Sequence, residues 1–193
     1  MFRLKEPTAS AIESAIAEAA RSPPTVPRFL YAEGVRNQRL PSAFSGDYSE
    51  SVLGRGQVAF ARARHGFERW EMFDLGWVSV ANPAATIALG QTVCVKVSSL
   101  GLWSLNVSRI VEVVDIPNRF GFVYATTGLH VESGEERFLL ELDPDSMQVT
   151  YSLEAVSRPR NRLAQFGFPI TRAFQHRFAR ESHARMQQIA NRL

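Results

Sequence analysis

The chain of 193 residues has a single cysteine, Cys94, and no long apolar run. One cysteine excludes an internal disulfide and any cysteine-based zinc cluster. No stretch approaches the roughly 18 consecutive apolar residues that a transmembrane helix needs. No apolar segment typical of a signal peptide follows residues 1–5. We therefore expect a cytoplasmic protein.

Motifs for catalysis and cofactor binding are also lacking. No serine occupies a G-x-S-x-G elbow, and Gly54 and Gly56 lack the third glycine of a dinucleotide-binding fingerprint, so they are expected to form a strand-to-helix turn. The four histidines are scattered without carboxylates at ligand spacing. Cys94 alternates with valines and has no histidine nearby, which makes a nucleophilic role weak. We expect neither a metal site nor a cofactor.

The composition is that of one folded domain. Apolar residues make up 45% of the chain and charged residues 21%, as in ordinary globular proteins. We expect an N-terminal helix and an irregular extension over residues 1–46, packed on a main domain at residues 47–193. The first helix is expected at residues 8–20, where Ser10 and Glu13 have the spacing of a capping box.

Between residues 92 and 157 the hydrophobic period switches to two, the period of β-strands. Turn signals at 116–118, 133–134 and 143–145 separate the apolar runs. Connections this short predict an antiparallel meander. With short strands at 48–55 and 76–80, it makes a sheet of about six to seven strands. The residues grouped by face, run by run, are Val93, Val95 and Val97; Phe120, Phe122 and Tyr124; Phe138, Leu140 and Leu142; and Met147, Val149, Tyr151 and Leu153.

Two further stretches have helical periodicity. Phe60, Ala63, Phe67 and Trp70 predict a helix over about residues 57–73, with its aromatic side chains in the core. A long helix is expected from about residue 162 to the C-terminus, with Pro169 kinking or restarting it. Its apolar stripe needs an apolar surface, and the concave face of the sheet is available. The stripe consists of Phe166, Ile170, Phe174, Phe178, Met186, Ile189 and Leu193.

Basic residues are concentrated in this last segment. From residue 158 onward there are eight arginines and one acidic residue, Glu181, so the rest of the chain is net acidic. The arginines can contact an anionic membrane surface. Alternatively, they can form a solvated helix face that complements an acidic sheet. No module that reads DNA or RNA accompanies them, so we expect no specific nucleic-acid partner.

Five short motifs stand out along the chain: L-G-R-G at 53–56, G-L-W-S-L-N at 101–106, F-G-F-V-Y at 120–124, G-E-E-R-F at 134–138 and S-R-P at 157–159. With Phe60, Trp70 and Trp77, they resemble an uncharacterised bacterial and plant family, domain of unknown function nineteen-ninety. The segment A-T-T at 125–127 departs from the glycine-containing G-T-L of that family. The resemblance spans nearly the whole chain and implies no established activity.

The order of elements also resembles the helix-grip superfamily of START lipid-transfer domains, birch-pollen-allergen-like proteins and polyketide cyclases. In that superfamily the last helix grips a curved sheet, and the space between them holds an apolar small molecule. The expected fold class is therefore α+β: a curved antiparallel sheet gripped by a long C-terminal helix, START-like, with an extra N-terminal helix.

Three polar residues are candidates for the chemistry of such a cavity. Glu136 shares strand parity with Phe138, so it can orient a ligand or act as a general acid or base with a raised pKa; a strand beginning one residue later would leave it solvated. Arg109, close to Trp103, can bind a carboxylate or phosphate head. It can equally form a structural bridge to a carboxylate of Glu112, Asp115 or Glu136. His130, in an expected loop, can border the cavity mouth.

Our first hypothesis is a module that binds an apolar or amphipathic small molecule or lipid. A cyclase-like or hydrolase-like enzyme using Glu136 or His130 is the first alternative, and an interaction protein using the arginine-rich helix is the second. The sequence favours no reaction and indicates no oligomeric state. The expected ligand-binding residues are Trp77, Trp103, Arg109, Phe122, Tyr124, Glu136, Phe138 and Tyr151.

Overall fold

The computed structural model describes residues 3–26, 40, 43–130, 132–159 and 168–192. Its seven strands form one antiparallel sheet in the order β1-β7-β6-β5-β4-β3-β2. The strands are β1 (Ser45–Arg55), β2 (Val78–Val80), β3 (Thr92–Ser99), β4 (Leu102–Ile116), β5 (Arg119–Thr126), β6 (Glu132–Leu142) and β7 (Gln148–Pro159). The helices are α1 (Ala9–Ala20), α2 (Gly56–Glu68), the short 3-10 helix η2 (Glu71–Phe73) and α4 (Phe168–Ala190).

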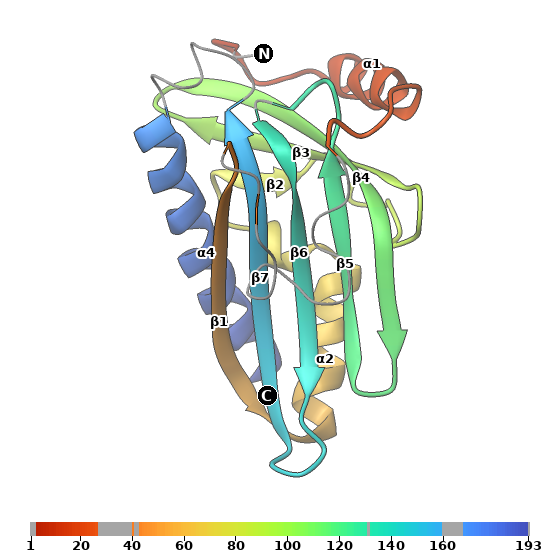
Figure 1. Cartoon of the computed structure of the whole chain (residues 1–193), viewed down its shortest axis with the longest axis vertical. Helices are drawn as coiled ribbons and strands as arrows, with labels where there is room; N and C mark the ends of the chain where they lie inside the picture. Colours follow the sequence, from red (N-terminus) through yellow and green to blue (C-terminus); the bar gives the residue numbers. More distant parts are fainter. Residues whose placement is uncertain (1–2, 27–39, 41–42, 131, 160–167, 193) are drawn as a thin grey trace.

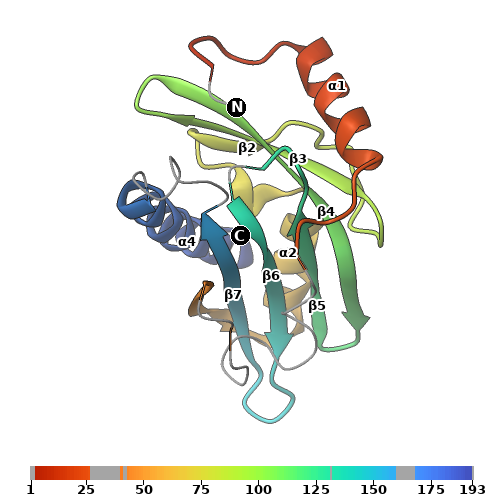
Figure 2. The same cartoon turned by 45° about the horizontal axis from the view of Figure 1, so that its top comes forward.

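The helices cover the two faces of the sheet unequally. Helices α2 and α4 pack against each other on the concave face, and α1 lies on the opposite face against β3 and β4 (Figure 1). Figure 2 shows β2, β3 and one end of β4 crossing above the remaining strands at a steep angle. The predicted α+β fold, a curved sheet gripped by the last helix, is confirmed.

Irregularities in the strands account for the curvature. The register shifts between Ile110 and Glu112 in β4, where a β-bulge also switches which residues face the core. Before the bulge Ile110 points to the core, and after it Val113 does, while Val111 packs on the opposite face. A second shift lies between Val52 and Gly54 in β1. Bulges bend the strands and increase their twist, so the sheet wraps around the helices.

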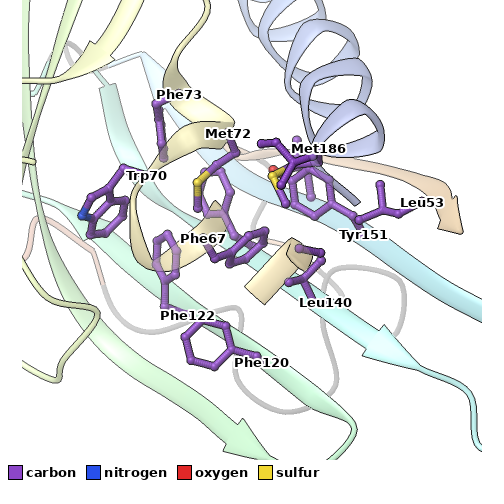
Figure 3. Packing of buried hydrophobic residues seen from close by; sticks show 14 of the residues in the cluster. Leu53, Phe67, Trp70, Met72, Phe73, Phe120, Phe122, Leu140, Tyr151 and Met186 are labelled. Carbon is purple, nitrogen blue, oxygen red and sulfur yellow. The ribbon is translucent and has the colours of Figure 1, made fainter. Parts of the chain in front are cut away.

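The core is aromatic and is built around α2. Phe67 meets Phe120, Phe122 and Tyr151 edge to face, with ring centroids 6.2, 6.3 and 5.4 Å apart (Figure 3). Phe60, Ala63, Phe67 and Trp70 are all buried, as predicted. The expected helix ends earlier than residue 73, because Trp70 adopts a left-handed conformation (φ 59°) that starts the 3-10 turn.

Two local details differ from expectation, and part of the predicted C-terminal helix is not described. The cap of α1 is Thr8 rather than Ser10, and its hydroxyl accepts a hydrogen bond from the Ala11 N–H. Met147 lies in the turn before β7 with φ 58°, so it does not join the inner face. The expected start of α4 near residue 162, Phe166 and Leu193 lie outside the described residues, as does the side chain of Ile170.

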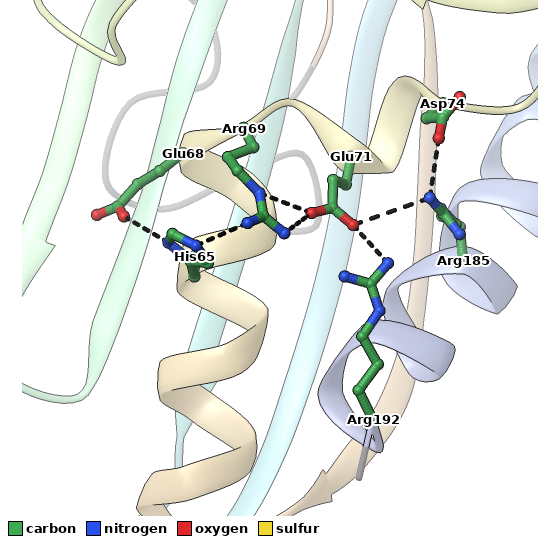
Figure 4. Close-up of polar contacts among 7 residues, drawn as sticks. All are labelled: His65, Glu68, Arg69, Glu71, Asp74, Arg185 and Arg192. Carbon is green, nitrogen blue, oxygen red and sulfur yellow. Dashed lines mark hydrogen bonds and ion pairs between the residues drawn. The ribbon is translucent and has the colours of Figure 1, made fainter.

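Ion pairs hold the C-terminal segment to the rest of the molecule. Arg172 binds Asp47 of β1, and Arg177 binds Glu181 within α4. Arg185 donates to Asp74 at 2.8 Å and Arg192 to Glu71 at 2.7 Å (Figure 4). Of these four acidic partners only Asp47 lies on the sheet, so among these contacts the expected alternative, an arginine face that complements an acidic sheet, holds for Arg172 alone. Among the helices that the structure describes, none is long and apolar enough to cross a membrane.

His183 joins α4 to β1 through two hydrogen bonds. Its Nε2 lies 2.9 Å from Ser49 Oγ, and its Nδ1 lies 2.8 Å from Ser51 Oγ. Its ring also packs on Tyr151, with centroids 4.8 Å apart. Burial lowers the pKa of His183 to about 4, so the ring is neutral at physiological pH.

Candidate functional site: a cavity between the sheet and α4

A cavity of about 270 Å³ lies between the concave face of the sheet and the first half of α4. The other part of the concave face is occupied by α2, whose Phe67 fills the space above Phe122 and Tyr151. The predicted cavity therefore exists over only part of the sheet. Its volume is close to the lower limit of roughly 300 Å³ for pockets that bind drug-sized molecules.

The apolar wall is formed by Trp77 with two phenylalanines of α4. Trp77 and Phe174 pack with ring centroids 5.7 Å apart, and Phe178 packs on Phe73 at 5.2 Å. The indole N–H of Trp77 donates to Glu181 at 2.6 Å, and the Arg177 guanidinium lies 4.5 Å from its ring centroid. These contacts fix the orientation of the indole, so this wall is held in place.

Glu136 forms part of the polar wall. It lies opposite Tyr124 in the register of β5 and β6, and the Tyr124 hydroxyl donates to Glu136 Oε2 at 2.6 Å. The pKa of Glu136 is raised to about 7, mainly by burial and less by the nearby carboxylates of Glu132 and Asp47, while the Tyr124 hydrogen bond opposes the rise. Burial likewise keeps the pKa of Tyr124 well above its usual value, so the phenol remains a donor.

Glu132 lies four residues before Glu136 on the same strand, and strand periodicity places both side chains on one face. The Gln175 amide of α4 donates to Glu132 Oε2 at 2.7 Å. Burial raises the pKa of Glu132 to about 7, although Gln175 and the nearby Arg172 act in the opposite direction. The cavity thus contains two carboxyl groups that titrate near neutral pH.

His130 borders the cavity from the connection between β5 and β6. Its Nδ1 accepts a hydrogen bond from the backbone N–H of Glu132 at 3.1 Å. A neutral ring therefore carries its proton on Nε2. Both residues named as acid–base candidates, Glu136 and His130, border the same cavity.

The predicted ligand-binding residues divide into three groups. Trp77, Tyr124 and Glu136 line the cavity. Phe122, Phe138 and Tyr151 share the concave face but are at most 1% exposed in the core, since they lie beside Phe67 of α2 or the helix α4. The Tyr151 hydroxyl, for example, is hydrogen-bonded to Ser182 of α4 at 2.9 Å.

Trp103 and Arg109 lie on the other face of the sheet, which corrects their predicted position. Alternation in β4 turns Ser104, Asn106 and Ser108 toward the cavity and the intervening residues away from it. Arg109 donates to the carbonyl oxygens of Ala19 and Ala20 at the end of α1, both at 2.7 Å. It therefore stabilises a helix C-terminus rather than binding a ligand head or bridging to a carboxylate.

Sequence reasoning missed Asp47, Asn106, Glu132 and Gln175 as cavity residues. Glu132 was detectable, because it shares parity with Glu136. The other three come from β1, β4 and α4, and their approach depends on how these elements pack.

Two other chemistries find no support in the described residues. Cys94 is covered by α1, and burial raises the pKa of its thiol to about 11, so it is not a thiolate at neutral pH. No group of three or more His, Cys, Asp or Glu side chains in the described part of the chain is placed to hold a metal ion.

Comparisons with known proteins agree with this architecture. The sequence profile of a family described as Domain of unknown function (DUF1990) matches residues 30–185. A UPF0548 protein from Deinococcus radiodurans is 33% identical over 198 residues, which cover 96% of each chain. A UPF0548 protein from Dictyostelium discoideum is 36% identical over 152 residues, covering 73% of this chain and 70% of that protein.

A solved structure is similar in fold. The Zhui aromatase/cyclase from Streptomyces sp. R1128 superposes with a TM-score of 0.54 and 12% identity, over 77% of this chain and 94% of that chain. At such low identity the similarity shows a shared helix-grip fold and nothing about chemistry.

Proposed function

The chain belongs to the family described as Domain of unknown function (DUF1990), and from its helix-grip fold we propose that it is a binding module for an apolar or amphipathic small molecule. The observation that supports this proposal is the cavity of about 270 Å³ between the sheet and α4. It has a fixed aromatic wall on one side and hydrogen-bonding groups on the other, the usual arrangement of a ligand pocket.

The size of the cavity narrows the class of ligand. A volume at the lower end of the ligand-pocket range favours a compound with one ring system or a short chain. A lipid with two long acyl chains needs the space that α2 occupies. We therefore favour a small amphipathic compound over a membrane lipid.

Native mass spectrometry of the purified protein tests the proposal directly. The matched variants are A155F and A184F. Ala155 lines the cavity and lies opposite Glu136 and Asp47 in the sheet, so a phenylalanine there fills the space. Ala184 is exposed on α4 and serves as the control. We expect wild type and A184F to retain a co-purified small molecule that A155F lacks; equal behaviour of A155F and wild type would contradict the proposal.

An acid–base enzyme is the second candidate, favoured by Glu136. A carboxyl group with a pKa of about 7, hydrogen-bonded to Tyr124 inside a cavity, is suited to proton transfer at neutral pH. In that case the mass of the captured compound changes with time in wild type but not in E136Q, while both proteins bind it. A captured compound that stays unchanged in wild type supports the pure binding function.

Peripheral contact with anionic membranes through α4 is a weaker proposal. Arg172, Arg177, Arg185 and Arg192 already pair with acids of the same molecule. Arg180, which is exposed, is the best remaining contact. Flotation with anionic vesicles tests it, and R180E should abolish the association; equal flotation of R180E and wild type would contradict it.

A further inference from the structure

The charged groups that line the cavity are mainly acidic. Asp47, Glu132 and Glu136 line it, and no lysine or arginine among the described residues does. His130 and His176 are the basic side chains of its lining in that part of the chain. Glu135 also borders the cavity, but it pairs with Val156 of the outer-face cluster, so strand parity directs its side chain away.

Two of these carboxyl groups have no direct counter-ion among the residues that the structure describes. Asp47 is paired with Arg172, which donates to it through both terminal nitrogens. Glu132 and Glu136 instead accept hydrogen bonds from neutral donors, Gln175 and Tyr124. Over the described ranges, neither glutamate forms an ion pair with an arginine or lysine. A buried carboxylate without a counter-ion is costly, so these two groups favour an incoming cation.

The unsatisfied polar atoms of the cavity point to the same class of ligand. Apart from Glu135, whose side chain is directed away, three lining residues each have a buried side-chain oxygen without a hydrogen-bond partner within the described part of the molecule: Glu132 Oε1, Asn106 Oδ1 and Gln175 Oε1. Glu132 is only 8% exposed and Asn106 only 9%. All three atoms are acceptors, and leaving buried acceptors unpaired costs free energy. A ligand that completes them must bring donors.

We propose, building on the binding function above, that the ligand is an organic cation: a protonated amine carried on a small apolar or aromatic body. An ammonium group has three N–H donors and no acceptor, which suits the buried oxygens of Glu132, Asn106 and Gln175 that have no hydrogen-bond partner among the described residues. The rings of Tyr124 and Phe174 beside the cavity suit a cation attached to an apolar body. The ligand proposed here carries a positive charge, whereas a ligand head bound by Arg109 would carry a negative one.

Other ligand classes fit less well. A carboxylate or phosphate head would meet Glu132 and Glu136, and none of the arginines or lysines that the structure describes lines the cavity beside it. A divalent metal ion needs a cluster of at least three suitable side chains, and the described residues contain none. A neutral alcohol can donate only one hydrogen bond, so it can pair with only one of these three acceptor oxygens.

Binding of an amine should release protons near neutral pH. Both glutamates have pKa values of about 7 because they are buried, and a bound ammonium favours their ionised forms. The other charged or titratable groups around them are Asp47 with Arg172, His130, His176 and Tyr124. Of these, Asp47 and Arg172 neutralise each other, and a smaller proton release in E132Q or E136Q than in wild type identifies the glutamates, rather than the histidines, as its source.

Calorimetry with three probes of matched shape tests the inference. The probes are phenethylamine, phenethyl alcohol and hydrocinnamate, which place a cation, a neutral hydroxyl and an anion at the end of similar bodies. We expect the amine to bind about tenfold more tightly than the alcohol, and hydrocinnamate to bind most weakly. Titration in two buffers of different ionisation enthalpy should reveal proton release with the amine alone.

The variants E132Q and E136Q keep the shape of the cavity and remove one charge each. Each should weaken the amine about tenfold and leave the alcohol within about twofold. E13Q is the matched control, because Glu13 is exposed on α1 across the sheet. An amine affinity that survives both cavity substitutions overturns the inference.

The remaining outcomes separate the two proposals. If the alcohol or hydrocinnamate binds as tightly as the amine, and A155F abolishes that binding, the amine inference fails and the binding function stands. If no probe binds, and A155F matches wild type in native mass spectrometry, both proposals fail.

Discussion

Replacing Glu136 by glutamine tests whether the ionised carboxylate of Glu136 destabilises the folded protein. Burial raises the pKa of Glu136 from its ordinary value of 4.5, which also applies to an unfolded chain, to about 7 in the folded protein. Between these pH values the folded protein keeps a proton that the unfolded chain has released. The free energy of unfolding therefore falls as the pH rises through this window. A shift of roughly 2.5 pKa units corresponds to about 3 kcal/mol.

The E136Q variant should lose this contribution, because an amide does not titrate. Its oxygen can still accept the Tyr124 hydrogen bond, which is 2.6 Å long in wild type. Its NH₂ group adds a buried donor, which costs about 1–3 kcal/mol independently of pH. The informative quantity is the change in the stability difference between variant and wild type. We expect the unfolding free energy of E136Q, relative to that of wild type, to increase by about 3 kcal/mol as the pH rises from about 4 to about 8.

Urea unfolding followed by tryptophan fluorescence measures this difference, since Trp70 is buried and Trp77 half-buried in the folded protein. Glu132 has a similar pKa and leaves a residual slope in the variant, while His183 affects both proteins equally. E13Q, on the exposed face of α1, controls for the loss of one negative charge. Parallel stability curves for wild type and E136Q over this pH range would refute the reasoning.

Three further predictions concern the scaffold. The pKa of His183 is lowered to about 4, so wild type should lose about 3 kcal/mol relative to H183Q as the pH falls from about 6.5 to about 4; urea unfolding of both proteins measures this difference, from which the opposite contribution of the two glutamates cancels. A Cβ at Gly121 would lie 2.2 Å from the Phe138 carbonyl oxygen, so G121A should cost about 3 kcal/mol. Gly56 has open space and only a positive φ, so G56A should cost about 1 kcal/mol; equal shifts in their thermal melts would contradict this account. R109M removes the hydrogen bonds to the end of α1, so it should speed hydrogen exchange in α1 and leave amine binding unchanged. Weaker amine binding by R109M would mean that Arg109 belongs to the binding site.

Parts of the candidate site were predictable because strand periodicity is local. Glu136 follows the same alternation as Phe138 and Leu140, so its position on the inner face could be inferred from neighbouring residues. The same rule failed for Arg109, because the polar residues Ser104, Asn106 and Ser108 line the cavity from β4. Because the inward-facing residues of this strand are polar, its pattern of apolar and polar residues does not show which face is the inner one.

The sequence by itself determined the order of strands and helices, the antiparallel meander, the aromatic core around Phe67 and the inward position of Glu136. Each of these depends on periodicity within one segment or on short turns. Only the tertiary structure decided that α2 fills part of the concave face, that α1 covers Arg109, and that Asp47 and Gln175 meet Glu132. These contacts join residues far apart in the chain, and bulges and packing angles set them. Therefore neither the open volume of the cavity nor the charge of its lining could be inferred from the sequence.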